Sequence, residues 1–236
     1  MAGMLWLLPV ALGDTPWENC LPAATRDAAC RLTHFIAENA KTARAELKRI
    51  GHPRPLRELA IEQLSEAPTA ADIERLLAPL RAGHDIGLMS EAGCPAVADP
   101  GALLVRRAHE LGVTVKPLVG PSSLLLGLMA SGLDGQRFAF HGYLPARDPE
   151  RSRRIVELEG ESTRLRQTQI FIETPYRNQV LFNALLLACR PQTRLCLATD
   201  LSLPSEQIAT RRIAEWKATA APQLDKRPTV FLLLAD

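Results

Sequence analysis

The sequence of 236 residues predicts an α/β fold with two domains. In its first half, short apolar segments alternate regularly with segments of helical pattern, which is typical of a parallel sheet covered by helices on both faces. In its second half, strand-like segments follow one another with fewer helices between them, which indicates a mixed sheet. Polar loops follow two apolar segments of the first half, at the position where open α/β sheets bind ligands.

The N-terminal domain is expected to cover residues 1–116 and the C-terminal domain residues 117–236, with the boundary near 115–120. In the first domain the apolar pattern predicts strands at 4–10, 32–38, 85–90 and 113–120, and a short strand within 56–64. Helical patterns lie between them at 17–31, 41–50, 69–83 and 101–111. Thr69 is a candidate N-cap and Gly83 a stop signal for the third of these helices.

The second domain is expected to contain five strands and three helices. Its strands are predicted at 138–145, 167–175, 193–200, 206–213 and 228–236. Its helices are predicted at 122–131, 148–159 and 176–189.

Composition excludes several classes of protein. The formal net charge is only +2, so an overall electrostatic attraction to nucleic acid is weak. The five cysteines are scattered without a CxxC pair, which predicts reduced thiols in a cytoplasmic protein. The five histidines have no metal-ligand spacing, so we expect no metal site. The apolar N-terminal segment is too short to cross a bilayer, and we expect a buried strand there.

The loop "SEAGCPAVADPG" (90–101) carries two acidic groups beside exposed backbone. At the carboxyl end of a strand, Glu91 and Asp99 could accept hydrogen bonds from a ribose diol or an amino group. Gly93 would allow a close backbone approach. The alternative is an ordinary strand-to-helix turn in which Asp99 caps the helix that follows Pro100.

The segment "GPSSLLLGLM" (120–129) predicts a helix start with Ser122 or Ser123 as its cap. The free N–H groups of such a terminus could receive a carboxylate or another polar group of a ligand. The alternative is a helix start that binds nothing. No P-loop and no GxGxxG motif is present, which argues against a nucleoside triphosphatase and an ordinary dinucleotide enzyme.

The segment "IAENAKTARAELKR" (36–49) places Lys41, Arg44 and Lys48 at helical spacing on one face. Residues 41–57 hold six cations against one acid, and a local patch of this kind could contact phosphates. The alternative is a solvated helix face, the usual meaning of a charge run.

Taken together, the loops resemble those of one family. The motifs, in the family's order, are "LPVALGD" (8–14), "AENAK" (37–41), "SEAGCPAVADPG" (90–101), "VGPSS" (119–123), "HGYLP" (141–145) and "FIETPYR" (171–177). They resemble the tetrapyrrole methylase superfamily, the class III S-adenosylmethionine-dependent methyltransferases. Within it they are most similar to the branch of ribosomal RNA small-subunit cytidine 2′-O-methyltransferases.

The resemblance implies two α/β domains with a cofactor cleft between them, S-adenosylmethionine as cofactor, and usually a homodimer. It implies cofactor contacts from the following residues: Pro9, Glu91, Gly93, Cys94, Ser122, Ser123, Leu124, Ile172 and Thr199. If the acceptor must lose a proton, Glu38 is the first candidate base and Glu173 the second. Lys41, Arg44 and Lys48 are the candidate RNA contacts.

The sequence also departs from the family pattern. Glu91 stands where the family usually has Asp, and Asn39-Ala40-Lys41 replaces an Asp-Thr-Arg segment, so position 39 cannot supply a base. The chain ends at Asp236 without the C-terminal helical extension common in RNA-methylating members, which puts the RNA target in question.

The leading hypothesis is therefore a cytoplasmic, homodimeric S-adenosylmethionine-dependent methyltransferase that acts in rRNA processing on the ribose 2′-oxygen. One alternative keeps the chemistry but takes a small molecule or a tetrapyrrole as acceptor. Another is a non-catalytic paralogue that binds S-adenosylmethionine. A dehydrogenase is a poorer third option, because the phosphate-binding fingerprint is missing.

Overall fold

The computed structural model describes residues 3–236, which divide into two compact units. Unit 1 ends at Ser122 and unit 2 begins at Ser123. The sequence predicts a domain boundary at 115–120, and in the structure the last strand of the first sheet occupies Val115–Pro117. That strand pairs with the first strand of the chain, so it belongs to unit 1.

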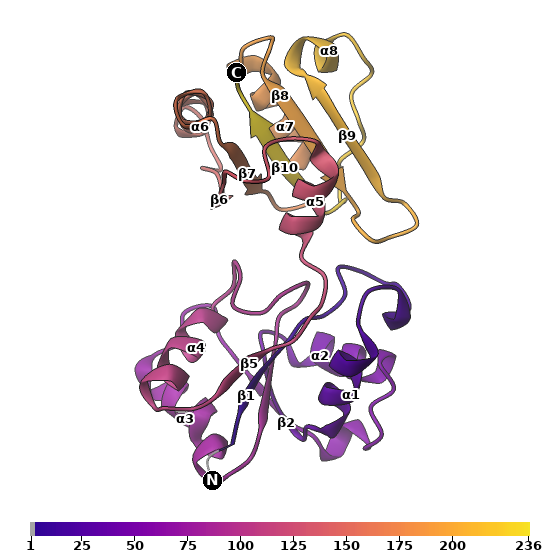
Figure 1. Cartoon of the computed structure of the whole chain (residues 1–236), viewed down its shortest axis with the longest axis vertical. Coiled ribbons are helices and arrows are strands. Elements are labelled where there is room, and N and C mark those ends of the chain that lie inside the picture. Colours follow the sequence, from indigo (N-terminus) through magenta and orange to yellow (C-terminus); the bar gives the residue numbers. More distant parts are fainter. Residues whose placement is uncertain (1–2) are drawn as a thin grey trace. The chain divides into compact units, whose positions relative to one another are not determined.

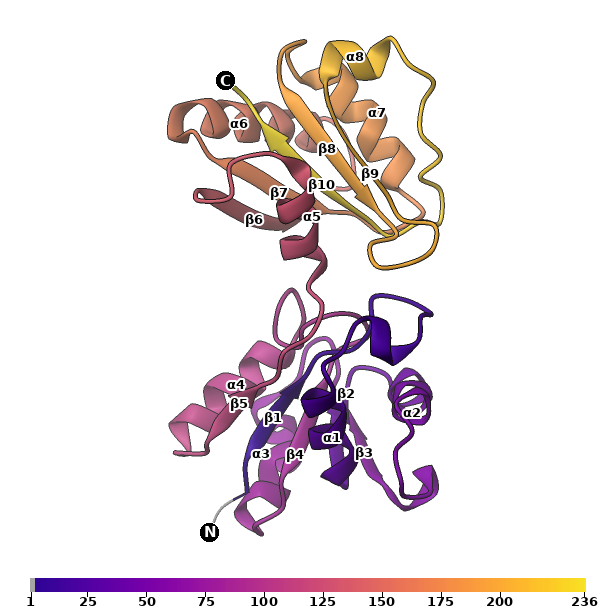
Figure 2. The ribbon, with the colours of Figure 1, turned by 45° about the vertical axis from the view of Figure 1, so that its right-hand side comes forward.

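Unit 1 is built on a five-stranded sheet with the order β3-β2-β4-β1-β5, of which Figure 1 labels β1, β2 and β5. Its strands are β1 (Leu5–Leu8), β2 (His34–Ala37), β3 (Ala60–Gln63), β4 (Ile86–Met89) and β5 (Val115–Pro117). Every pair in this sheet is parallel. The carboxyl ends of all five strands therefore lie at one edge, where Figure 2 shows the loops after β1, β4 and β5.

Helices cover both faces of this sheet. They are α1 (Ala23–Arg31), α2 (Ala40–Arg49), α3 (Ala70–Arg81) and α4 (Gly101–Glu110), with 3₁₀ turns η1 (Trp17–Asn19) and η2 (Leu56–Glu58). Phe35 packs with α1 and α2 in one core cluster, and its neighbour Ile36 packs with α3 and α4 in the other. Successive residues of a strand face opposite sides of the sheet, so the buried residues of β2 pack into both core clusters.

The first residues of α3 and α1 test two of the helix starts that the sequence predicts. Thr69 caps α3 in a capping box with Asp72, as its position predicts. The helix predicted at 17–31 is instead the turn η1 followed by α1, with Pro22 at the N-cap of α1. Proline fixes its own φ and has no N–H to donate, so it fits the start of a helix and not its interior.

Unit 2 holds a mixed sheet with the order β6-β7-β10-β8-β9. Its strands are β6 (Phe138–Tyr143), β7 (Thr168–Ile172), β8 (Arg194–Thr199), β9 (Gln207–Arg212) and β10 (Thr229–Leu234). Only β6 and β7 pair in parallel, while β10 runs antiparallel to both β7 and β8. These two sheets confirm the predicted α/β class, with a parallel N-terminal and a mixed C-terminal sheet.

The helices of unit 2 are α5 (Ser123–Ser131), α6 (Glu150–Leu165), α7 (Asn178–Ala188) and the short α8 (Ile213–Lys217). The main core lies under α6, α7 and α8, where the rings of Phe171 and Phe231 stack at 5.9 Å between centroids. On α5, a Cβ at Gly127 would meet Ala198 of β8 at 3.4 Å, so this helix packs closely on the sheet.

Two elements of unit 2 differ from the prediction. The helix expected to end at residue 159 continues through Gly160 to Leu165, because Ile155, Leu158 and Ser162 lie buried on one face. The helix ends where Arg166 adopts a left-handed conformation with φ of 49°. The short helix α8 has no counterpart in the prediction; it buries Ile213 and Trp216 at the end of β9.

Candidate active site

Three loops of unit 1 join at the carboxyl edge of its sheet. The loop after β1 and the loop after β4 form an antiparallel bridge, in which Val10 N–H donates to Gly93 O at 2.9 Å and Gly93 N–H donates to Val10 O at 3.2 Å. The loop after β5 is tied to α1, since Thr25 Oγ1 donates to Val119 O at 2.7 Å. The ends of β1, β4 and β5 are thereby held in one place, as a strand-end binding site requires.

Two glycines make this junction possible. A Cβ at Gly120 would lie 2.3 Å from the Cβ of Pro9, so only a glycine lets these two loops touch. Gly93 has φ of +74°, and a Cβ there would meet Leu12 at 3.3 Å. The predicted residues Pro9 and Gly93 therefore lie in this junction.

Cys94 joins the same junction from the β4 loop. Its Sγ lies 3.4 Å from Pro121 O, in the loop that leads to Ser122. Burial raises the pKa of the Cys94 thiol, so it stays protonated near neutral pH and is not a nucleophile. We infer that its thiol fills space and donates a weak hydrogen bond.

Asp99 organises the remainder of the β4 loop. Its Oδ1 accepts hydrogen bonds from the N–H groups of Ala96 and Gly101, both at 2.8 Å. Ala96 and Ala98 have φ of 65° and 62°, a conformation that side chains other than glycine rarely adopt. Burial raises the pKa of Asp99 despite these two hydrogen bonds. Asp99 thus acts on its own loop, in agreement with an ordinary strand-to-helix turn, but the N-cap of α4 is Pro100 and not Asp99.

Glu38 follows β2 and lies beside the β4 loop. Burial raises the pKa of the Glu38 carboxyl, and the negative charges of Asp99 and Glu91 raise it further, while a hydrogen bond from the Glu91 backbone opposes them. A carboxyl with a raised pKa at a strand end is a candidate general base. The structure thus brings Glu38 and Glu91 together, whereas the second candidate base, Glu173, lies in unit 2 and accepts hydrogen bonds from Arg177.

Asn39 has a structural role at the start of α2. Its side-chain oxygen accepts from Lys41 N–H at 2.9 Å and from Thr42 N–H at 3.4 Å, so it is the N-cap. A neutral amide fulfils this role as well as an aspartate does.

The three candidate RNA contacts, Lys41, Arg44 and Lys48, lie exposed along α2. None of them forms an ion pair within residues 3–236. The one acid of this helix, Glu46, is already paired with Arg49 at 2.5 Å. The charged side chains exposed on α2 are therefore all cationic.

The remaining predicted residues belong to unit 2. Ser123 and Leu124 begin α5. Ile172 ends β7 and pairs with Val230, while Thr199 ends β8 and pairs with Thr229. Since β10 lies between these strands, Ile172 and Thr199 flank its start at one edge of the sheet. Thr199 is buried, and its hydroxyl lies 3.2 Å from that of Thr229.

Sequence reasoning missed three residues of the junction in unit 1. They are Val10, which forms the bridge, Gly120, which touches Pro9, and Pro121, whose carbonyl faces Cys94. A glycine at the end of a predicted strand and directly before a proline is the signal in the sequence for a close approach of two loops.

In the part of the chain that the structure describes, no helix is long and apolar enough to cross a membrane. Among the same residues, no group of three or more histidine, cysteine, aspartate or glutamate side chains could hold a metal ion.

No family model matches the sequence. Several proteins are nevertheless similar to this chain in sequence. A protein of Xylella fastidiosa strain Temecula1 named ribosomal RNA small subunit methyltransferase I is 32% identical over 205 residues, which cover 87% of this chain and 72% of that protein. Proteins of the same name from Pseudomonas aeruginosa and Escherichia coli O157:H7 are 36% and 32% identical over 63% and 69% of this chain. The chain spans about half the length of these two, 52% and 56%.

Two solved structures share the fold. The methyltransferase CobJ superposes with a TM-score of 0.66 at 16% identity, over 99% of this chain and 95% of the other. The uroporphyrin-III-C-methyltransferase of Thermus thermophilus gives 0.54 at 19% identity, over 99% and 93%. The chain therefore belongs to the family of the proteins named ribosomal RNA small subunit methyltransferase I, and it shares the fold of these two methyltransferases.

Proposed function

We propose that this chain transfers the methyl group of S-adenosylmethionine to the RNA of the small ribosomal subunit, at a ribose 2′-hydroxyl. The observation that carries the proposal is the relationship to a ribosomal RNA small subunit methyltransferase I over 87% of the chain. The exposed cationic face of α2 supports an RNA acceptor, because unpaired cations on one helix face suit a phosphate backbone.

We propose that the junction of Pro9, Gly93, Cys94 and Ser122 holds the cofactor on unit 1. The junction supports such a site because Gly93 and Gly120 let three loops approach one another closely at the carboxyl ends of the strands. S-adenosylmethionine, when bound, supplies an activated methyl group, and the chain has to bind and align the reactants. The predicted contacts of unit 2, Ser123, Leu124, Ile172 and Thr199, and the exposed Glu91 remain proposals of the same kind.

Glu38 is proposed as the base that takes the proton of the acceptor hydroxyl. Its raised pKa supports this role, because a base is most effective when its pKa approaches the working pH. A positioned base contributes about 10²- to 10⁴-fold to turnover. Glu38→Gln should lower turnover by that order and leave cofactor affinity unchanged.

The deciding experiment supplies S-adenosylmethionine with a labelled methyl group, together with small ribosomal subunits unmethylated at the target and, separately, their naked RNA. Label in a 2′-O-methylated nucleoside after nuclease digestion is the expected result. Calorimetric titration with S-adenosylmethionine runs in parallel. Cofactor binding without label in either RNA preparation would refute the RNA acceptor and leave the methyltransferase fold with another substrate.

A cytoplasmic location and a homodimer are also proposed. In support of a dimer, α5 exposes Leu125 and Met129 by 53% and 79%, an apolar pair at helical spacing that association would cover. Light scattering on the purified chain tests this, and a monomeric mass at assay concentration would contradict it.

A further inference from the structure

The chain contains only two tyrosines, Tyr143 and Tyr176, and both are well exposed, by 56% and 73%. Tyr143 ends β6, and Tyr176 lies four residues after the end of β7. These strands pair in parallel, with Tyr143 opposite Ile172, so both tyrosines lie at the same carboxyl edge. Neither hydroxyl makes a hydrogen bond within residues 3–236. Fold stability does not explain two rings left in solvent at one edge.

The turn that carries Tyr176 is held firmly. Buried Glu173 accepts hydrogen bonds through Oε1 from Thr174 N–H at 2.7 Å and from the Arg177 guanidinium at 2.7 and 3.0 Å. Arg177 N–H in turn donates to Thr174 O at 2.9 Å. These bonds fix the backbone on both sides of Tyr176.

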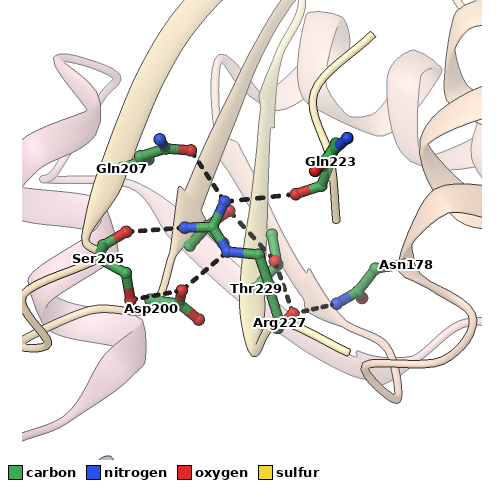
Figure 3. Close-up of polar contacts among 8 residues, drawn as sticks. Asn178, Asp200, Ser205, Gln207, Gln223, Arg227 and Thr229 are labelled. Atoms are coloured by element: carbon green, nitrogen blue, oxygen red, sulfur yellow. Dashed lines mark hydrogen bonds and ion pairs between the residues drawn. The ribbon is translucent and has the colours of Figure 1, made fainter. Parts of the chain in front are cut away.

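A second network holds the neighbouring loop before β10 (Figure 3). Arg227 pairs with buried Asp200 at 2.8 Å and donates to Ser205 O at 2.7 Å. Buried Asn178, two residues after Tyr176, donates to Arg227 O at 2.6 Å. The next residue back, Lys226, donates its N–H to Pro175 O at 3.1 Å. The 224–228 loop and the Tyr176 turn therefore form one rigid support.

Tyr143 is presented in a similar way. It follows a register shift in β6, where Gly142 has φ of 65°, and it precedes Leu144, which is buried in the core of unit 2. The exposed Tyr143 therefore lies between an irregular residue and a buried anchor. A tyrosine ring has two side-chain torsions, so little entropy is lost when a flat partner binds it.

We propose that Tyr143 and Tyr176 stack on unpaired bases of a single-stranded RNA segment, which makes them substrate-binding residues. This inference rests on the proposed RNA methyltransferase function. Exposed aromatic rings on a rigid edge are the usual platform for splayed bases, because every base has a flat face. In an A-form duplex the bases are already stacked on one another and offer no free face.

Charge contributes little at this edge. Arg147 and Lys226 are exposed without an ion pair within the described residues, but the exposed Glu150 lies three residues after Arg147 and the exposed Asp225 directly precedes Lys226. The contribution of stacking to RNA affinity should therefore be nearly independent of salt concentration, whereas the contribution of the α2 cations should weaken as the salt concentration rises.

The test measures binding of a short fluorescein-labelled RNA strand by anisotropy, with the full chain and the variants Y143A, Y176A, Y143F and Y176F. Each alanine variant should bind the single strand about 5- to 140-fold more weakly, with an unchanged salt slope. Each phenylalanine variant should stay within about threefold of the wild type, because the ring is retained. None of the four should alter affinity for the same strand annealed to its complement. Leu187→Ala, at a site 85% exposed on α7, is the control for loss of apolar surface.

Unchanged single-strand affinity in both alanine variants would overturn the inference, and so would equal losses in alanine and phenylalanine variants, which would indicate a hydrogen-bonding role. Calorimetry with S-adenosylmethionine accompanies every variant. If the wild type binds the cofactor but neither RNA form, the proposed RNA function fails first. If the wild type binds RNA and the tyrosine variants match it, only the stacking inference fails.

Discussion

Gly120→Ala tests the junction of loops in unit 1 most directly. Gly120 does not adopt a positive φ, so an alanine carries no backbone strain at this position, and the effect is steric alone. The added Cβ would lie 2.3 Å from Pro9 Cβ and 2.8 Å from Pro9 Cγ. Non-bonded carbons pack at about 3.5–4.0 Å, so one of the two loops has to move by roughly 1 Å or more.

The cost follows from that overlap. Pro9 is a rigid ring at the end of β1 and cannot rotate away as a long side chain would. Overpacking of this kind costs about 1–3 kcal/mol. If the variant relieves the overlap by shifting one loop, cofactor binding must restore the original loop geometry. Restoring that geometry costs the same free energy as the overlap. S-adenosylmethionine affinity should then fall by about 5- to 140-fold.

The measurements are urea unfolding for stability and calorimetry for cofactor affinity. Gly135→Ala is the matched control, because a Cβ there meets no atom within 4 Å and its φ is not positive. That variant should be as stable as the wild type or slightly more so, since alanine restricts the unfolded chain. A Gly120→Ala protein with wild-type stability and wild-type affinity would refute both the contact with Pro9 and the role of this junction.

Three further predictions follow from the structure. Arg227→Ala should lower the free energy of unfolding by about 3 kcal/mol, because it leaves the buried carboxylate of Asp200 unpaired. The control is Arg75→Ala, which removes an ion pair with Glu62 whose two side chains are each 55% exposed, and it should lower the free energy of unfolding by less than about 1 kcal/mol in the same urea experiment. Replacing all three exposed cations of α2 by glutamine should reduce the slope of log affinity against log salt by about two for single-stranded RNA, and an unchanged slope would exclude that face from the RNA contact. Turnover should fall as pH is lowered through the pKa of Glu38, which is raised above the usual glutamate value, because only the carboxylate form can act as the base. If the Glu38→Gln variant keeps the same fall in turnover at low pH, the fall belongs to another group.

Much of the fold could be predicted from local pattern. Strands buried on both faces appear as continuous apolar runs, which is why the segments around β1, β2 and β4 were found within a few residues of their true bounds. Boundaries failed where tertiary packing overrides a local signal. A glycine often ends a helix, yet α6 continues beyond Gly160. Burial of Leu158 and Ser162 on either side of it outweighs the helix-propensity cost of one glycine, about 1 kcal/mol.

The site was less accessible to sequence reasoning for a geometric reason. Gly93 stood out as a loop residue and Pro9 came from the family resemblance, but the two loops meet through the bridge between Val10 and Gly93, which are far apart in the chain. The contact of Gly120 with Pro9 is of the same kind. Local pattern can mark a glycine as unusual, but only the strand order tells which loop it approaches.

Asn39 shows how the structure gives meaning to a departure from the family pattern. An aspartate at this position would cap α2 as Asn39 does, through the N–H groups of Lys41 and Thr42. It would also add a negative charge next to Glu38, whose pKa is already raised by burial and by the charges of Asp99 and Glu91. The asparagine keeps the cap and omits the charge, which limits the electrostatic cost of ionising Glu38. The replacement is therefore compatible with an active enzyme that relies on Glu38 at this strand end, and it does not by itself indicate lost activity.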